Sequence, residues 1–173
     1  SAYESNPDIF TDNWNLPESG NGIDDLLDEV KWELDWLLKM CNNDGTTIIK
    51  MGSISFAENE EAPPSANVDQ RYYGPTCTSA SISAASMLAH AAKVLGSFSI
   101  FSSYAQTLED EAVAAWDYVL PFIENGTLET DCDDGSIVAG DADRDVAEQI
   151  EEAIGAAVYL FDLTGETEYS DFV

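Results

Sequence analysis

The sequence has very little positive charge: its 173 residues include only 6 Lys plus Arg, against 34 Asp plus Glu, and a single His. The formal net charge is −28 at pH 7. Nucleic acids and anionic lipid headgroups are bound mainly through Lys and Arg, because their phosphates are negatively charged. The composition therefore argues against a nucleic-acid partner and against binding to a membrane surface.

The sequence also lacks a long hydrophobic run. Its most apolar stretch, residues 79–101, is interrupted by His90, Lys93 and several serines, which predicts a buried helix and not a membrane span. The N-terminus begins in polar sequence and shows no signal peptide. We therefore expect any targeting segment to have been removed or to lie outside this chain.

Cysteine is scarce as well. Cys41, Cys77 and Cys132 are far apart, and no C-x-x-C motif is present. Three cysteines cannot all pair within one chain, and this spacing does not form a zinc cluster. The redox compartment of the protein is left open by these residues.

Apolar residues nevertheless make up 45% of the chain, so core-forming residues are not depleted. A net charge of this size destabilises a compact state by self-repulsion unless salt screens it or cations neutralise it. No positive charge occurs between Lys93 and Arg144, so salt bridges cannot provide the neutralisation. We therefore expect a high-salt environment, with bound Ca²⁺ as a lesser contributor.

The hydrophobic periodicity predicts an all-α protein with long loops and at most a short β-hairpin. Apolar residues from 23 to 38 follow one helical stripe, and Trp32 and Trp36 add a second, so we expect this helix to be buried on more than one side. Further helices are expected at about 76 or 78 to 95, 104–124 and 143–163, with the first turn of another at 166–173. A short β-like run is expected at 46–51. The long loops at 53–75 and 127–141 are of the kind that usually carries function.

Acidic clusters near the fourth helix are candidate cation sites. Four acids match positions 1, 3, 5 and 12 of an EF-hand loop: Asp141, Asp143, Asp145 and Glu152. Val146 stands where that loop needs Gly, so the acidic N-terminus of a helix is the better interpretation. Glu151 with Glu152, or the acids of residues 131–134, are alternative ligands for a hard cation, although clusters like these are more often a solvated face.

No motif of covalent or phosphate chemistry is present. The sequence contains no G-x-S-x-G, no Gly-rich phosphate loop and no H-E-x-x-H. Catalytic carboxylate pairs cannot be selected by spacing among 34 acids. His90 lies in the middle of an expected helix among Ala and Leu, which favours a packing role over a catalytic one.

Arg71, Tyr72 and Tyr73 form a candidate substrate-binding site. They lie at the end of a long loop, just before a helix, where two adjacent aromatic rings can form the wall of a cleft. Aromatic rings together with a planar guanidinium are well suited to holding sugar rings. Two tyrosines that simply anchor a loop explain the same pattern equally well.

The stretch from Asn15 to Met40, with its N-L-P-E-S-G-N-G entry and its W-E-L-D-W-L-L-K-M helix, strongly resembles the catalytic domain of glycoside hydrolase family 9, the cellulases. The resemblance continues in register through most of the chain. It includes Asp44-Gly45 with Lys50, then residues 71–75, and then the helix from Glu151 to Gly165.

The resemblance implies a partial (α/α)6 barrel built of helical hairpins. It also implies an inverting endoglucanase-type hydrolase of β-1,4-glucans such as cellulose. An enzyme of this kind would be secreted. In that mechanism one carboxylate activates water while a second protonates the leaving oxygen. The calcium ligands of the family include an acidic pair that corresponds to Glu151 and Glu152.

Departures from the family concern the catalytic groups themselves. The water-activating aspartates belong to a D-A-G-D motif upstream of this chain, and the catalytic Glu lies far downstream; residues 139–143 resemble that motif only by letters. Ile49 replaces a His before Lys50, and Asp24 replaces a Pro. We therefore expect residues 1–173 to form one incomplete domain that is inactive alone and packs against the missing parts or other copies. The alternative is a non-catalytic glycan-binding or self-assembling structural protein derived from this fold.

Overall fold

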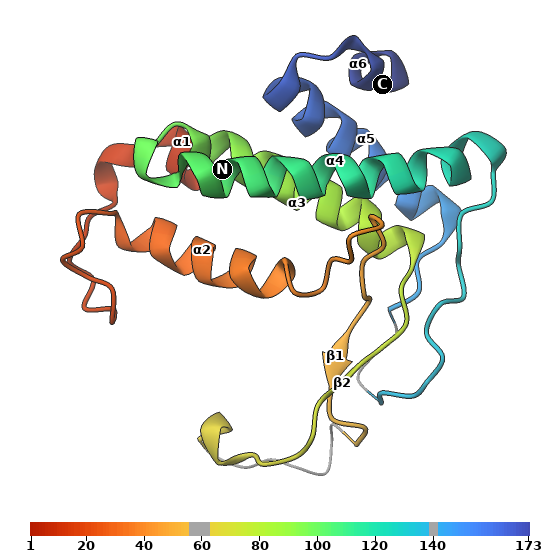
Figure 1. Cartoon of the computed structure of the whole chain (residues 1–173), viewed down its shortest axis with the longest axis horizontal. Helices are drawn as coiled ribbons and strands as arrows, with labels where there is room; N and C mark the ends of the chain where they lie inside the picture. Colours follow the sequence, from red (N-terminus) through yellow and green to blue (C-terminus); the bar gives the residue numbers. More distant parts are fainter. Residues whose placement is uncertain (56–62, 139–141) are drawn as a thin grey trace.

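The computed structural model describes residues 1–55, 63–138 and 142–173, and it is mostly helical (Figure 1). The helices are α1 (Ala2–Ser5), α2 (Asp25–Leu37), α3 (Thr78–Gly96), α4 (Ser102–Asn125), α5 (Val146–Thr164) and α6 (Thr167–Phe172). Short 3₁₀ turns occur at Pro7–Ile9, Pro64–Ala66 and Ser99–Phe101. The four long helices and the final short one confirm the sequence prediction, whereas α1 was not predicted. None of the helices in the described ranges has an apolar stretch that would cross a membrane.

Helix α3 is the centre of the core and packs mainly against α4 and α5. Its buried face is rich in small residues, and Ala85 and Ala89 are completely buried. Small side chains allow neighbouring helices to approach closely, so that larger residues such as Leu88 and Trp116 fill the space between them. The aromatic ring of Trp116 also packs edge-on against Tyr169 of α6.

Helix α2 lies beside this three-helix core and touches it along one side only (Figure 1). Leu27 and Leu34 are buried, but the Trp32 side chain is 70% exposed and Trp36 is 37% exposed. The prediction that this helix is buried on more than one side is therefore wrong for this chain. The second apolar stripe is present, but no element within residues 1–55, 63–138 and 142–173 covers it.

The turn-rich N-terminal segment is held by two aspartates. The Asp12 carboxylate accepts the N–H groups of Gly20 and Gly22, at 2.5 and 2.6 Å, and these bonds hold its pKa below its ordinary value. Asp25 is completely buried at the start of α2, where it accepts the hydroxyl of Ser19 at 2.9 Å. These bonds fix how the chain enters α2.

The start of α5 has the geometry expected of an acidic helix N-terminus. Asp145 is the N-cap and its carboxylate accepts the Glu148 N–H at 2.9 Å, while the Glu148 carboxylate accepts the Asp145 N–H at 3.0 Å. This reciprocal pair is a capping box. Val146 begins the helix, which agrees with the interpretation of these acids as a helix N-terminus and not an EF-hand loop. Asp141 lies outside the described residues.

The β-run predicted at 46–51 forms a strand only at its last residue, and Thr47 and Ile48 make isolated bridges instead. Strand β1 (Met51–Gly52) pairs antiparallel with β2 (Tyr72–Tyr73), with Met51 opposite Tyr73. Before the strand, Gly45 has φ +83°, and a Cβ there would lie 2.2 Å from the Ala114 carbonyl of α4. A glycine is therefore required at this turn, which directs the chain from α2 toward the hairpin.

A disulfide joins Cys77, at the start of α3, to Cys132 in the loop that precedes α5, across a sequence separation of 55. Cys41 is free and partly buried. The sequence left the pairing open because three cysteines offer several combinations. The fold selects this pair because it brings the two residues to a Cα–Cα distance of 5.8 Å.

Candidate functional site

The candidate substrate-binding residues lie on the short hairpin, outside the helical core. Arg71 is exposed, and the side chains of Tyr72 and Tyr73 are 41% and 57% exposed. Their strand is anchored through backbone hydrogen bonds, since the Gly74 N–H donates to the Lys50 carbonyl at 2.9 Å. The hairpin therefore presents two accessible aromatic rings on a backbone that is fixed on one side.

A hollow of about 390 Å³ lies at the base of this hairpin. It is bounded by the end of α2, residues 47–50, α3 and the start of α5. Trp36 contributes an indole, while Lys50, Arg144 and Glu152 contribute charged groups. The mixture of one aromatic surface with a few polar groups is typical of small-ligand sites. Arg71 and the two tyrosines do not line this hollow.

The candidate metal ligands Glu151 and Glu152 are exposed on α5. Glu152 accepts the Ser83 hydroxyl of α3 at 2.8 Å, which links the two helices. Together with Glu148 and Arg144, the two glutamates line a shallow hollow of about 380 Å³. The guanidinium of Arg144 brings a positive charge to the same hollow, which disfavours a second cation there.

Calcium takes six to eight oxygen ligands, so the arrangement of these carboxylates can be tested against it. In the described ranges, three side chains bring possible ligand atoms within 4.8 Å of one another: Cys77, Glu129 and Cys132. The two cysteines form the disulfide, so their sulfurs are not thiolate ligands. Glu151 and Glu152 belong to no such group, and by themselves they do not complete a calcium site.

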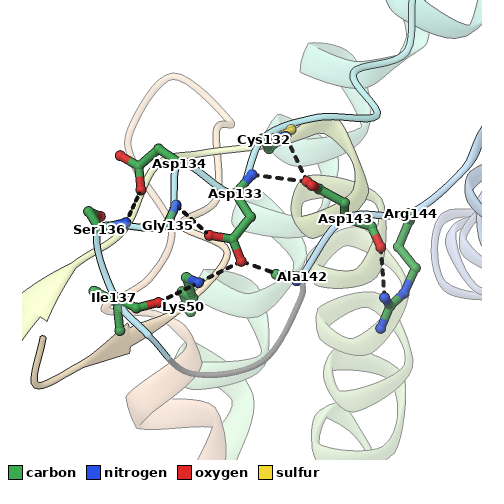
Figure 2. A network of polar contacts seen from close by, with 10 residues as sticks. All are labelled: Lys50, Cys132, Asp133, Asp134, Gly135, Ser136, Ile137, Ala142, Asp143 and Arg144. Atoms are coloured by element: carbon green, nitrogen blue, oxygen red, sulfur yellow. Dashed lines mark hydrogen bonds and ion pairs between the residues drawn. The ribbon is translucent and has the colours of Figure 1, made fainter. Parts of the chain in front are cut away.

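Lys50 and Asp133 form an ion pair that is largely shielded from water (Figure 2). The Lys50 ammonium donates to the Asp133 carboxylate at 2.5 Å and to the Ile137 carbonyl at 2.7 Å, and both charged side chains are only 10% exposed. The hydrogen bond from Lys50, followed by that from the Gly135 N–H, holds the pKa of Asp133 below its ordinary 3.8. This pair was not predicted from the sequence, although Lys50 and the acids of 131–134 were each recognised as notable.

The other carboxylates of this loop are also used for structure. The Asp143 carboxylate accepts the N–H groups of Cys132 and Asp133, at 2.6 and 2.9 Å (Figure 2). Asp134 accepts the Ser136 N–H at 2.9 Å. Asp133, Asp134 and Asp143 therefore shape the loop through local hydrogen bonds and the Lys50 ion pair.

His90 has a structural environment, in agreement with the packing interpretation. Its ring stacks on Tyr159 of α5 at a centroid distance of 4.4 Å, and its Nε2 lies 2.8 Å from the Glu4 carboxylate. His90, followed by the N-terminal ammonium group, lowers the pKa of Glu4 to about 2. The ring links α3, α5 and the N-terminal segment, so these packing contacts explain why a histidine lies here.

Comparison with known proteins identifies the relatives of this fold. The sequence pattern of glycosyl hydrolase family 9 matches residues 1–173. Endoglucanase D of Acetivibrio thermocellus is 25% identical over 161 residues, which are 89% of this chain and 23% of that protein. The chain therefore spans about a quarter of the length of this curated relative.

Solved structures agree with the sequence match. A metagenome-derived glycoside hydrolase family 9 endoglucanase superposes with a TM-score of 0.83 and 32% identity, covering 99% of this chain and 30% of that one. A Zn-binding triple mutant of the family 9 endoglucanase J30 gives 0.74 and 25%, covering 99% and 31%. The helices of this chain are accordingly part of an (α/α)6 barrel.

Proposed function

The chain belongs to glycosyl hydrolase family 9, and on this premise we propose that it is a segment of an inverting β-1,4-glucan hydrolase that acts on cellulose-like polysaccharides. Residues 1–173 supply scaffold helices and part of the cleft wall of one incomplete domain. The match along the whole chain and the endoglucanase relatives support this proposal. The two catalytic carboxylates of an inverting mechanism are not assigned to any residue here.

The observation that best supports the proposal is the hollow at the base of the β1–β2 hairpin. Trp36 offers an aromatic face and Arg144 and Glu152 offer polar groups within about 390 Å³. Outside the hollow, Tyr72 and Tyr73 on β2 offer two further exposed aromatic rings. Glucan rings have apolar C–H faces and hydroxyl edges, so this combination suits a sugar chain that runs from the hollow to the hairpin.

Two variants test the glycan contact: Trp36→Ala, and Tyr72→Ala combined with Tyr73→Ala. Each is expected to weaken the affinity for cellohexaose about tenfold, equivalent to ~1.4 kcal/mol, because each removes an aromatic contact with the sugar. Isothermal titration calorimetry measures the affinity. The matched control is Trp32→Ala on the same helix, because Trp32 is 70% exposed and lines neither the hollow nor the hairpin.

An equal loss of affinity in Trp32→Ala would contradict a specific site, as would a wild-type chain that binds no cellohexaose at millimolar concentration. The chain alone is expected to show no turnover of carboxymethyl-cellulose. Measurable turnover would mean that the catalytic groups lie within these 173 residues.

The second candidate function is a non-catalytic glycan-binding or self-assembling protein. It is favoured by apolar side chains that the described helices leave exposed, notably Val30 and Trp32 on α2 and Val158 and Phe161 on α5. Exposed apolar groups of this kind mark interfaces, which either the remaining parts of the domain or other copies of the chain would cover. A reading frame that continues upstream into a D-A-G-D motif supports the hydrolase; glycan binding without any such continuation supports the alternative.

Calcium at Glu151 and Glu152 is a further proposal, supported by their position in the family pattern and by a third carboxylate, Glu148, in the same hollow. Because the ligand set is incomplete, we expect weak binding, with a Kd on the order of 1 mM. Titration with Ca²⁺ should show this binding in the wild type and none in Glu151→Gln/Glu152→Gln. The control Glu166→Gln/Glu168→Gln removes the same charge elsewhere, and an equal loss in that control would contradict a site.

A further inference from the structure

Lys50 occupies the point where three distant segments meet. It immediately precedes β1, it lies opposite the residues that follow β2, and its ammonium reaches the loop at 133–137. Its side chain also lines the 390 Å³ hollow. None of these contacts is explained by helix packing.

On the hairpin side, Lys50 supports the backbone next to the tyrosines. The Gly74 N–H donates to the Lys50 carbonyl at 2.9 Å, and the Ile49 N–H donates to the Pro75 carbonyl at 2.9 Å. A Cβ at Gly74 would lie 3.2 Å from both the Cγ and the carbonyl oxygen of Lys50. The lysine stem therefore packs directly on the backbone that follows Tyr73.

On the loop side, the ammonium group of Lys50 connects the loop at 133–137 to the start of β1, and we call these contacts the Lys50 clamp. The ammonium group holds Asp133 and Ile137 (Figure 2). Val138 continues the contact, because its N–H donates to the Ile54 carbonyl at 3.0 Å. The position of a Cβ at Gly52 lies 3.4 Å from the Ile137 side chain, so the loop runs close against β1. Strand β1 is thus held between β2 on one side and this loop on the other.

The opposite charges of Lys50 and Asp133 favour this arrangement of the loop and the hairpin. Among the ion pairs of the described residues, Lys50–Asp133 has the least exposed side chains, 10% each, against 34% and 43% for Lys31–Asp35 on α2. Removing the charge of either partner would leave the other charge with little contact with water, so the two groups stabilise each other at close range. The pair therefore favours one position of the loop relative to the hairpin.

We propose that Lys50 is a positioning residue for glycan binding: by joining Asp133 and Ile137 to the β1–β2 hairpin, it holds the strand that carries Tyr72 and Tyr73 beside the hollow. The effect on binding rests on the proposed function. The effect on the hairpin does not, because it follows from contacts within the chain.

Three variants test this role in the full chain. Lys50→Met keeps the stem and removes the charge, Lys50→Arg keeps the charge, and Lys50→Met/Asp133→Asn removes both charges so that neither is left unpaired. Hydrogen exchange at the Gly74 and Val138 amides reports the clamp, and calorimetry with cellohexaose reports binding. The control is Lys31→Met, which breaks an ion pair on α2.

Lys50→Met and the double variant are expected to raise exchange at Gly74 and Val138 about tenfold and to weaken cellohexaose binding about tenfold, while Lys50→Arg restores most of both. Lys31→Met should change neither. Unchanged exchange in both uncharged variants overturns the inference, and so does raised exchange with unchanged affinity. A wild type that binds no cellohexaose refutes the proposed function, and the exchange data then decide on their own whether Lys50 positions the hairpin.

Discussion

Replacing Cys77 and Cys132 together by Ala is expected to lower the free energy of unfolding by about 3–4 kcal/mol. The disulfide closes a loop with a sequence separation of 55. Such a crosslink restricts the unfolded chain, and the restriction grows slowly with the length of the closed loop. Alanine is the appropriate replacement because the Cys77 side chain is completely buried, where a serine hydroxyl would need a new partner.

The disulfide also secures a buried polar junction next to it. The Thr78 hydroxyl donates to the Gln149 side-chain oxygen at 2.7 Å, and the Gln149 amide donates to the Glu129 carbonyl at 2.7 Å. Thr78 and Gln149 are completely buried, so these bonds cannot be replaced easily by water. Loss of the crosslink is therefore expected to loosen the contact among α3, the loop before α5 and α5 itself.

Urea unfolding followed by circular dichroism, at one salt concentration, measures this change. The matched control is Cys41→Ala, which removes the free cysteine and should cost less than about 1 kcal/mol because Cys41 is only partly buried. Burial raises the pKa of the Cys41 thiol, which limits its exchange with the disulfide. Equal stabilities of the double variant and the control would contradict a stabilising crosslink.

Raising NaCl from about 0.05 M to about 2 M is expected to increase the melting temperature by roughly 10 °C, or ~3 kcal/mol for a chain of this size. The cause is the net charge of −28, whose repulsion opposes the compact state. Exposed ion pairs such as Lys93–Asp162 are too few to offset it, although salt weakens them too. Differential scanning calorimetry across the salt series measures the shift.

The control for charge is a variant with fewer exposed acids: Asp117→Asn, Glu124→Gln and Asp171→Asn. All three side chains are exposed, so their replacement should leave the core unchanged and reduce the dependence on salt. A melting temperature that stays constant or falls with salt would refute the proposal of a high-salt environment. So would a variant whose dependence on salt is as steep as that of the wild type.

The long helices could be predicted from sequence because each has a clear periodic pattern and recognisable ends. The α5 prediction was three residues early because Asp143 looks like helix sequence, whereas its carboxylate binds the loop amides and Asp145 is the actual N-cap. Helix α1 was missed because it has only four residues. Such a short helix carries no periodic signal.

The candidate site was predicted less completely. The aromatic pair Tyr72–Tyr73 was found because adjacent tyrosines before a helix are visible in one stretch of sequence. The partnership of Lys50 with Asp133 was not, because these residues lie 83 positions apart and each has many possible partners among the acids. That Trp36 and Glu152 line one hollow could not be predicted either, because they too are far apart in the sequence.

The helical class, the family pattern and the large negative charge could be predicted from the sequence, because they depend on periodicity, local motifs and composition. The pairing of Cys77 with Cys132, the contact of Lys50 with the loop at 133–137 and the exposure of Trp32 became visible only in the folded chain. Each of these depends on which distant segments come into contact. Such contacts are set by the packing of α3 against α4 and α5 together with the turn at Gly45, which brings the hairpin to the end of that core.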